Sequence, residues 1–518
     1  MRFTFQVFSV HRCFPTCHGH ASSDSSSSTQ TSILSSSLLH QPTTMSAEAS
    51  LNRNPHVLVF PYPAQGHMLS LLDLTHQLSL RGVTITILIT PKNLPFLSSL
   101  LSSHPSSVTP LVLPFPSDPL IPPGVEHVKD LGNRGNLPIM AALGKLHDPL
   151  INWFNSHPNP PVAILSDFFL GWTQHLATRL QIPRIAFFPT GAFLPYIFDY
   201  IWSNVEKVKS FSEVEFSHLP GSPVFKQEHL PSVFQLYKQS DPNLEFVKDS
   251  MIANTKSWGY VLNYFDALET QYVQIFKKHV GHDRVFTVGP LSLTGPDVSG
   301  GGNSGSGSEP NDQVLTWLDG CPDGSVVYVC FGSQKLLRKE QMEALSNGLE
   351  KSGTRFIWVV KPGTTQQQDD GYGVVPDGFE NRLMGRGLVI KGWAPQSLIL
   401  SHKAVGGFLS HCGWNSVLEG IVGGVMILAW PMEADQFMNA RLLVDYVGVG
   451  VRVCEGEDSV PDSDELGRVI AESMTGGVAV KVQAKDLKEK ALAAMSDDGS
   501  SIKNLDRFAE QLGQLGRR

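Results

Sequence analysis

A chain of 518 residues is long enough for two or three domains, each with its own hydrophobic core. A hydrophobic content of 41% predicts a soluble globular protein, and a net charge of −8 argues against general binding to nucleic acids or anionic membranes. No run of about 18 apolar residues occurs, so no transmembrane helix is expected.

The six cysteines include no C-x-x-C pair, which predicts free thiols in a reducing compartment. The sequence also contains no N-x-[ST] glycosylation motif. Both features favour a cytoplasmic protein. Residues 1–44 are rich in serine and contain Arg2, Arg12 and a single acid, Asp24. That composition is typical of an organelle transit peptide, which would place the protein in a plastid, but we favour a disordered or mispredicted extension over residues 1–54.

The first half alternates between strands and helices. Six short hydrophobic runs predict strands, at residues 56–60, 83–89, 162–165, 184–188, 260–264 and 285–288. The turn at 61–66 follows the first of them and leads into a helix with apolar residues on helical spacing. The proline-rich segment 113–124 predicts a surface loop, and residues 205–257 read as irregular. Loops of this kind beside a scaffold are where a small-molecule ligand would be shaped.

The second half repeats this alternation after a Gly/Ser-rich stretch at 294–311. That stretch lacks the Gly-Lys-[Ser/Thr] of a phosphate loop, so it predicts a flexible linker. Beyond it, the pattern predicts strands at 326–331, 356–360 and 388–391 and a helix at 338–351. Two α/β halves joined by a linker predict two Rossmann-like, doubly wound parallel-sheet domains that face each other across a cleft.

Residues 393–436 read as a further βαβα run, with strands at 407–411 and 426–430 and a helix at 414–422. Parallel sheets bind ligands beyond the carboxyl ends of their strands. His411, Asn415 and Ser416 would therefore lie at a helix N-terminus, whose free N–H groups and partial positive charge suit phosphate oxygens. This predicts a diphosphate site. The alternative is an ordinary turn whose polar residues only cap the helix.

The same residues resemble the signature box of the plant family-one UDP-sugar glycosyltransferases, which runs from a Trp to a Gln over 44 residues. Residues 393–436 have that length, and W-A-P-Q, H-C-G-W-N-S, E-G and D-Q are all in register. Met426 departs from the pattern, because the family usually has Pro there; we expect an effect on turn geometry only. Met45 is a possible true start, since M-S-A-E-A-S is how members commonly begin.

The resemblance covers about residues 55–515 and implies the GT-B architecture. It assigns acceptor binding to an N-terminal domain at 55–293 and UDP-sugar binding to a C-terminal domain at 312–497. It also implies that residues 498–518, with a helix at 500–513, pack back on the first domain.

His67 is the candidate base that takes the acceptor proton. It follows the first strand in Q-G-H-M, and an imidazole has a suitable pKa for this task. A His at such a turn is often only a cap or a packing residue, but the family's catalytic His stands at this G-H. Asp167, which ends another strand of the same half, would orient the imidazole, unless it is only a helix N-cap. The family usually continues with Asn-Pro where this chain has Leu69-Ser70.

The departing UDP would be stabilised by His411, Asn415, Ser416 and the Ser333 hydroxyl, with no metal or other cofactor. The D-x-D at 462–464 precedes a helix and is better explained by capping than by metal binding. The family pattern implies the other contacts to the UDP-sugar. Trp393 would stack on uracil with Gln396 beside it, Glu419 would bind the ribose, Asp435 and Gln436 the sugar, and Thr190 the sugar from the opposite domain. Ala394 and Trp414 complete the predicted donor site.

The sequence thus predicts an inverting glycosyltransferase. It would move a sugar from a UDP-sugar to a hydroxyl of a small hydrophobic acceptor, a phenol such as a flavonoid. The terminal Gln of the box favours glucose over galactose. A catalytically silent UDP-sugar-binding protein is an alternative, against which the presence of both His67 and Asp167 weighs. A nicotinamide oxidoreductase is less favoured, because no G-x-G-x-x-G follows a strand with an acid about twenty residues on.

Overall fold

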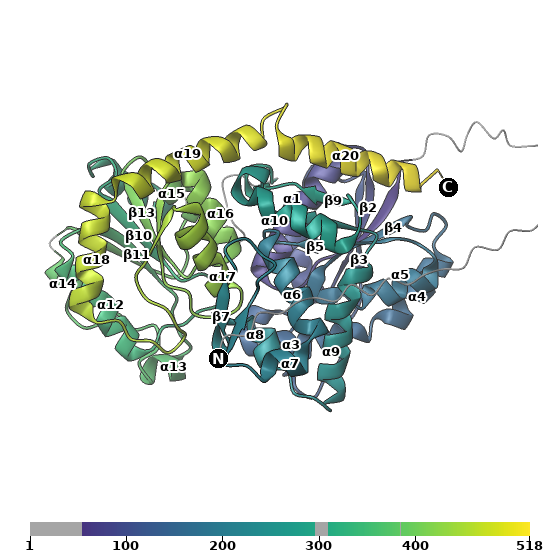
Figure 1. Ribbon diagram of the computed structural model, residues 1–518, viewed down its shortest axis with the longest axis horizontal. Helices are drawn as coiled ribbons and strands as arrows, with labels where there is room; N and C mark the ends of the chain where they lie inside the picture. Colours follow the sequence, from purple (N-terminus) through teal and green to yellow (C-terminus); the bar gives the residue numbers. More distant parts are fainter. Residues whose placement is uncertain (1–53, 296–308, 384, 518) are drawn as a thin grey trace, which may run out of the picture. The chain divides into compact units, whose positions relative to one another are not determined.

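The structure is a computed structural model that describes residues 54–295, 309–383 and 385–517. The predicted extension at 1–54 lies outside the described residues apart from Asn54, and so does the predicted linker at 294–311 apart from its ends. The remaining chain forms two lobes, each built on one parallel sheet (Figure 1).

The first lobe is built on a seven-stranded parallel sheet with the order β3-β2-β1-β4-β5-β8-β9. Its strands are β1 (His56–Phe60), β2 (Thr84–Ile89), β3 (Val108–Val112), β4 (Ala163–Asp167), β5 (Arg184–Phe188), β8 (Gly259–Leu262) and β9 (Val285–Thr287). The strand order reverses between β1 and β4, which pair directly with each other. Open α/β sheets form their binding crevice at such a reversal, outside the carboxyl ends of the strands.

The second lobe is built on a six-stranded parallel sheet with the order β12-β11-β10-β13-β14-β15. Its strands are β10 (Val326–Cys330), β11 (Arg355–Val360), β12 (Gly387–Lys391), β13 (Val405–Ser410), β14 (Met426–Ala429) and β15 (Gly450–Arg452). Here the order reverses between β10 and β13. The segments after these two strands carry Ser333 and His411, so this reversal also coincides with predicted site residues.

Helices cover both sheets (Figure 1). In the first lobe they are α1 (Gln65–Leu80), α2 (Ser98–Ser103), α3 (Asn136–Gly144), α4 (His147–Ser156), α5 (Thr173–Leu180), α6 (Phe193–Ser203), α7 (Val205–Lys209), α8 (Ser232–Gln235), α9 (Pro242–Ala253) and α10 (Asp266–Val280). The second half of the chain adds α11 (Glu309–Asp319), α12 (Lys339–Lys351), α13 (Thr365–Asp369), α14 (Phe379–Arg382), α15 (Gln396–Ser401), α16 (Trp414–Gly423), α17 (Gln436–Arg441), α18 (Ser463–Gly476), α19 (Val478–Ala494) and α20 (Ser500–Leu515).

The segment 205–257, predicted to be irregular, is instead largely regular. It contains α7, α8 and α9 and an antiparallel hairpin of β6 (Glu213–Glu215) and β7 (Val224–Lys226). A signal for α9 was present in the sequence, because Asp241 caps the helix and Pro242 stands at its first position. Strands β3 and β15 were not predicted. Strand β3 lies at the sheet edge and contains Pro110, which hides its pattern. The proline-rich segment 113–124 is a loop, as predicted.

The last helix of the chain, α20, packs against the sheet of the first lobe. Leu505, Phe508 and Leu512 are buried in the same apolar cluster as residues of β1 and β2. The ring of Phe508 lies 4.9 Å from that of Phe286 in β9, and the Ser501 hydroxyl donates to the Gly289 carbonyl. The chain therefore returns to its first lobe after completing the second.

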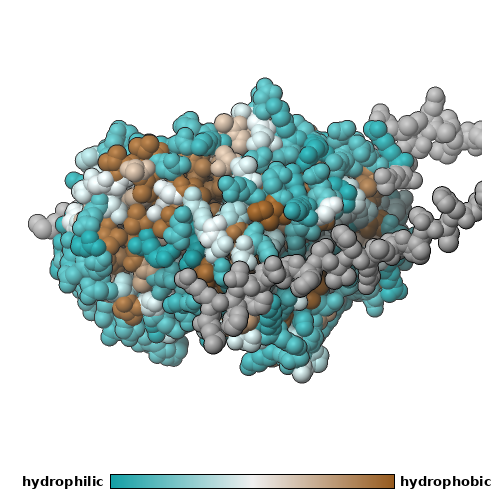
Figure 2. Space-filling view, viewed as in Figure 1, coloured by the Kyte–Doolittle hydropathy of each residue, from teal (hydrophilic) through white to brown (hydrophobic). Residues whose placement is uncertain are grey.

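The surface seen in Figure 2 is mostly hydrophilic, and hydrophobic side chains gather mainly over the second lobe. Helix α19 contributes exposed side chains, among them Val478 and Val482. Over the described ranges, we find no helix with the length and apolar character needed to cross a membrane.

Candidate active site

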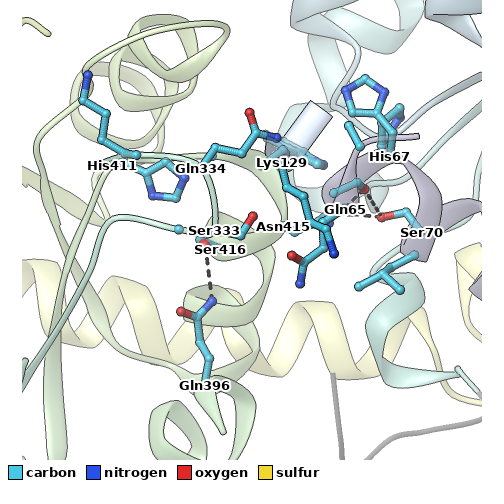
Figure 3. A pocket seen from close by; sticks show the side chains of 18 of the residues that line it. Gln65, His67, Ser70, Lys129, Ser333, Gln334, Gln396, His411, Asn415 and Ser416 are labelled. Atoms are coloured by element: carbon cyan, nitrogen blue, oxygen red, sulfur yellow. Dashed lines mark hydrogen bonds between the residues drawn. The ribbon is translucent and has the colours of Figure 1, made fainter. Parts of the chain in front are cut away.

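A cavity of about 1620 Å³ lies between the lobes and is lined by residues of both. Its walls include the segments that follow β1, β4 and β5 in the first lobe and β10, β13 and β14 in the second. Pockets for a single small ligand usually measure about 300–1,000 Å³, so this cavity has room for two. Figure 3 shows residues of both lobes converging on it.

His67 and Asp167 meet on the first-lobe side of the cavity. His67 stands in the first turn of α1, and its Nδ1 lies 2.9 Å from Asp167 Oδ2. Asp167 is fully buried, whereas the His67 side chain is 21% exposed. A carboxylate on Nδ1 fixes the imidazole tautomer and leaves Nε2 as the nitrogen available to a ligand. The pairing of β1 with β4 brings together these two residues, which are 100 positions apart.

Asp167 also caps a helical turn, so its side chain makes the contacts expected from both interpretations of this residue. Its Oδ1 accepts from the Phe169 N–H at 2.9 Å, while Oδ2 binds His67. Its carbonyl oxygen accepts from Arg184, a fully buried residue that also donates to Ser166 and Asn254. Burial lowers the pKa of Arg184 to about 10, which still leaves it charged at neutral pH. The two carboxylate oxygens of Asp167 are therefore held by two different groups, and Arg184 holds its backbone.

Aromatic rings surround the His67 imidazole, a feature that the sequence analysis missed. Phe168 stacks on it at 5.6 Å, Phe169 lies at 4.7 Å and Tyr62 at 5.5 Å between ring centroids. Phe168 and Phe169 also line the cavity, as do Leu194 and other apolar side chains. The signal was the F-F that directly follows Asp167. This wall suits a flat apolar ligand placed next to the imidazole.

His411 lies on the second-lobe side, just after β13 and before α16 (Figure 3). Its Nδ1 is buried with no hydrogen-bond partner among the described residues. Burial lowers the pKa of His411 to about 4, so the imidazole is neutral at pH 7. Its Nε2 would lie 2.7 Å from a Cβ at Gly332 and 2.6 Å from one at Gly413. Only glycine leaves room for the ring there, and the ring carries hydrogen-bonding capacity that a ligand could use.

Ser416, Gln396 and Glu419 form a polar network beside the first turn of α16. The Gln396 amide donates to Ser416 Oγ at 3.2 Å and to Glu419 Oε2 at 2.5 Å. The other Glu419 oxygen accepts from Ser397 at 2.7 Å, and burial raises the pKa of Glu419. Ser397 was not predicted as a site residue. Its position next to Gln396 in the sequence could have indicated it.

Trp393 lines the cavity with 48% of its surface exposed, a large area for an indole in a folded protein. Ala394, which follows it, is buried in the same wall. Trp414 also reaches the cavity, but its indole N–H donates to the Asn263 carbonyl of the first lobe at 2.8 Å. Ser333 lines the cavity after β10. Of these residues, Trp393 is the one that offers an open aromatic face to a ligand.

Asp435 and Gln436 lie at the start of α17 and line the cavity. Gln436 Oε1 accepts from the Met432 and Glu433 N–H groups, each at 3.0 Å. Asp435 Oδ2 accepts from Asn439 at 2.9 Å, and burial raises the pKa of Asp435. One oxygen of each side chain is thus held by protein donors, and each side chain has a further polar atom.

Two residues of the first lobe meet this wall of the cavity. Thr190 lines the cavity after β5, with its hydroxyl bonded to the Gly191 carbonyl. Ser232 accepts from the Ala434 N–H at 2.8 Å, so it joins the first lobe to the segment that carries Asp435. Nothing in the sequence pattern pointed to Ser232, because the bond spans 202 positions.

Asn415 is the site residue whose contacts differ most from the expectation. Its Nδ2 donates to the Gly66 carbonyl at 3.0 Å, and its Oδ1 accepts from Ser70 Oγ at 3.1 Å. Its amide is therefore bonded to α1 of the opposite lobe. The D-x-D at 462–464 lies apart from the cavity, and Asp462 caps α18 through the Glu465 N–H, as predicted.

Comparison with known proteins agrees with this geometry. A family model described as UDP-glucoronosyl and UDP-glucosyl transferase matches residues 293–472. UDP-glycosyltransferase 89A2 of Arabidopsis thaliana is 54% identical over 467 residues, covering 90% of this chain and 97% of the relative. Flavonol 3-O-glucosyltransferase UGT89B1 of the same plant is 50% identical, covering 89% of this chain and 97% of the relative.

Solved structures similar to this chain also come from UDP-glycosyltransferases. Arabidopsis thaliana UGT89C1 has been crystallised with UDP-L-rhamnose and with quercetin, and both structures are 41% identical to this chain. Their TM-scores are 0.73 and 0.71, and each match covers 89% of this chain and 100% of the other. With its two parallel-sheet lobes and the cavity between them, the chain belongs to the plant family-one UDP-dependent glycosyltransferases, enzymes of the GT-B fold.

Proposed function

We propose that the protein transfers glucose from UDP-glucose to a hydroxyl of a flavonoid-like phenol, with inversion at the anomeric carbon. The observation that carries the proposal is the His67–Asp167 pair beside the aromatic wall, across one cavity from the His411–Ser416 segment. The named relatives support the substrate class, since they include a flavonol 3-O-glucosyltransferase and a structure complexed with quercetin. Gln436 supports glucose as the sugar, and a flavonol 7-O-rhamnosyltransferase among the relatives makes rhamnose the alternative.

The reaction is a single displacement. His67 Nε2 takes the proton of the acceptor hydroxyl, and Asp167 stabilises the imidazolium that forms. The acceptor oxygen attacks the anomeric carbon from the face opposite UDP and forms the new glycosidic bond. The bond between that carbon and the phosphate oxygen breaks, and UDP leaves with the electron pair. The proton on His67 is then lost to solvent.

The second lobe holds the donor. Diphosphate and ribose binding there is supported by His411 Nδ1, which has no hydrogen-bond partner in the described part of the chain, and by the buried polar network around Ser416. The N–H groups at the start of α16 add a partial positive charge where negative charge develops on the leaving UDP. The exposed Trp393 ring is the platform for uracil, and Asp435, Gln436 and Thr190 surround the sugar. In this scheme the leaving group is stabilised by protein donors, so transfer should continue in the presence of EDTA.

The decisive experiment compares wild-type protein with His67→Ala in a transfer assay. Products from UDP-glucose or UDP-rhamnose and a panel of phenols are detected by mass spectrometry. We expect His67→Ala to bind UDP normally and to lose about 10²–10⁴-fold in kcat, the usual range for a missing general base. His76→Ala is the matched control, since His76 stands on the same helix but does not line the cavity. Wild-type turnover by His67→Ala would refute the base assignment.

We also propose that the protein acts in the cytoplasm. The four cysteines within the described residues are all free thiols, which supports a reducing compartment. Two fluorescent fusions test this, one starting at Met1 and one at Met45. Plastid fluorescence that depends on residues 1–44 would contradict the proposal.

A further inference from the structure

Ser70 joins the two lobes directly at the active site. It stands in α1, three residues after His67, and is 4% exposed. Its Oγ lies 3.0 Å from the Gly66 carbonyl oxygen and 3.1 Å from Asn415 Oδ1. Asn415 Nδ2 in turn donates to the Gly66 carbonyl at 3.0 Å. Figure 3 shows Ser70 and Asn415 facing each other across the boundary between the lobes. These three groups close a small polar triangle between the first turns of α1 and α16.

This contact depends on a residue that departs from the family pattern. Proline, which the family resemblance implies at this position, has no hydroxyl and could not donate to Asn415. Serine has a single hydroxyl proton, and the Gly66 carbonyl oxygen and Asn415 Oδ1 both lie within hydrogen-bond distance to share it. In the same helix, Thr75 makes the equivalent back-bond to the Leu71 carbonyl at 2.7 Å, with no partner from the other lobe among the described contacts.

The two helices joined by this triangle carry the two halves of the reaction. Helix α1 carries His67, and α16 begins at Trp414, three residues after His411, and carries Ser416. The distance between their first turns sets the distance between the imidazole and the anomeric carbon of a bound donor. A displacement of about 1 Å from the reactive geometry can lower a rate 10²-fold.

We propose that Ser70 is a positioning residue for sugar transfer, which holds the Asn415 amide and thereby fixes the His67 turn of α1 against the donor-binding turn of α16. The proposal rests on the proposed function above, because it assumes that His67 is the base and that α16 holds the donor. Ser70 itself does not take part in the chemistry. Its loss therefore affects the rate of transfer more than the binding of either substrate.

The test begins with Ser70→Ala, which removes one hydroxyl and introduces a good helix former. A hydrogen bond of ordinary net strength predicts a fall in kcat of about three- to tenfold. We expect the KM for UDP-glucose, the affinity for UDP and the melting temperature to stay close to wild type. Thr75→Val is the matched control, since it removes the same type of back-bond in the same helix and keeps the side-chain volume. Its kcat should stay within about twofold of wild type.

A double-mutant cycle with Asn415→Ala asks whether Ser70 acts through Asn415. If it does, Ser70→Ala lowers kcat in the wild-type background and has no further effect in the Asn415→Ala background. Equal losses in the two backgrounds would overturn the proposal. So would a Ser70→Ala variant with wild-type kcat, or a Thr75→Val variant that loses as much. A wild-type enzyme without transfer activity, or an active His67→Ala variant, is a different result and defeats the proposed function itself.

Discussion

The carboxylate of Asp167 performs two tasks with its two oxygens. One oxygen binds His67 Nδ1, and the other accepts the Phe169 N–H that begins the aromatic turn. One side chain therefore contributes both to the proposed catalytic pair and to the wall beside it. Substitutions at this position can separate the two tasks, because asparagine keeps an oxygen for the cap and loses the negative charge.

We predict that Asp167→Asn and Asp167→Ala both lower kcat by about 10²–10⁴-fold, because neither can orient and stabilise an imidazolium. Their stabilities should differ. The alanine variant also loses the cap and should be less stable than the asparagine variant by about 1 kcal/mol. Transfer assays and thermal melts of both variants check this. Equal melting temperatures would contradict the capping role.

Gln436 offers a second test at the residue scale. Its Oε1 accepts two backbone N–H groups at once, which leaves the amide NH₂ for a ligand. A neutral imidazole has a single acceptor nitrogen and cannot satisfy both N–H groups. We predict that Gln436→His lowers kcat/KM for UDP-glucose and shifts preference towards UDP-galactose. The ratio of kcat/KM for the two donors measures this, and an unchanged ratio would exclude a sugar contact by Gln436.

At the scale of elements, the kink in α10 brings an acid against the start of α6. Glu269 has non-helical backbone angles inside α10, and its carboxylate accepts from the Ala192 N–H at 2.6 Å and the Phe193 N–H at 3.3 Å. A Cβ at Gly191 would lie 1.9 Å from Glu269 Oε2, so only glycine fits there. This contact supports the segment that carries Thr190. Burial raises the pKa of Glu269 from 4.5 to about 7, in spite of these two hydrogen bonds.

This raised pKa makes stability depend on pH. The folded protein holds a proton on Glu269 between pH 4.5 and 7, where the unfolded chain has released it. The contribution of Glu269 is therefore complete below pH 4.5 and is lost as the pH rises through 7. We predict that, from pH 5 to pH 8, the wild type loses about 1–3 kcal/mol of stability relative to Glu269→Gln, which cannot ionise.

Urea denaturation of both proteins at the two pH values measures this difference. The nearby Tyr264 and Tyr272 do not titrate in this range, because burial raises the pKa of each. Parallel changes in the two proteins would show that Glu269 does not ionise in this range.

At the scale of the whole molecule, α20 makes the stability of the first lobe depend on the far end of the chain. Phe508 is fully buried against β9, and Leu505 and Leu512 lie in the same cluster. The first sheet thus lacks one covering helix until the entire chain has been made. A substitution that weakens this contact should therefore destabilise the lobe that carries His67.

We predict that Phe508→Ala destabilises the protein by about 3–5 kcal/mol, because it leaves a cavity against the first sheet. Glu510→Ala, on the exposed face of the same helix, should be close to neutral. Thermal melts compare the two, and hydrogen exchange of β1 and β9 shows whether the first lobe is the part that loosens. Unchanged protection of these strands would contradict the dependence.

The sequence alone determined which residue types were available and which strands they follow. His67 follows β1, Asp167 ends β4 and His411 follows β13, because buried parallel strands are hydrophobic runs that stop at polar turns. The segment 393–436 contains most of the predicted donor site, since its residues are close in the chain and share one βαβα unit. Local pattern also identified the cap at Asp462.

The tertiary structure alone decided which side chains meet across long separations. The Ser70–Asn415 contact spans 345 positions and the Ser232–Ala434 contact spans 202, and both depend on how the two lobes face each other. Side-chain periodicity reports only whether a residue faces its own core, so it contains no information about a partner on another lobe. For the same reason, the sequence contained no sign that the Asn415 amide bonds to α1, and the phosphate contact of Asn415 stays a prediction.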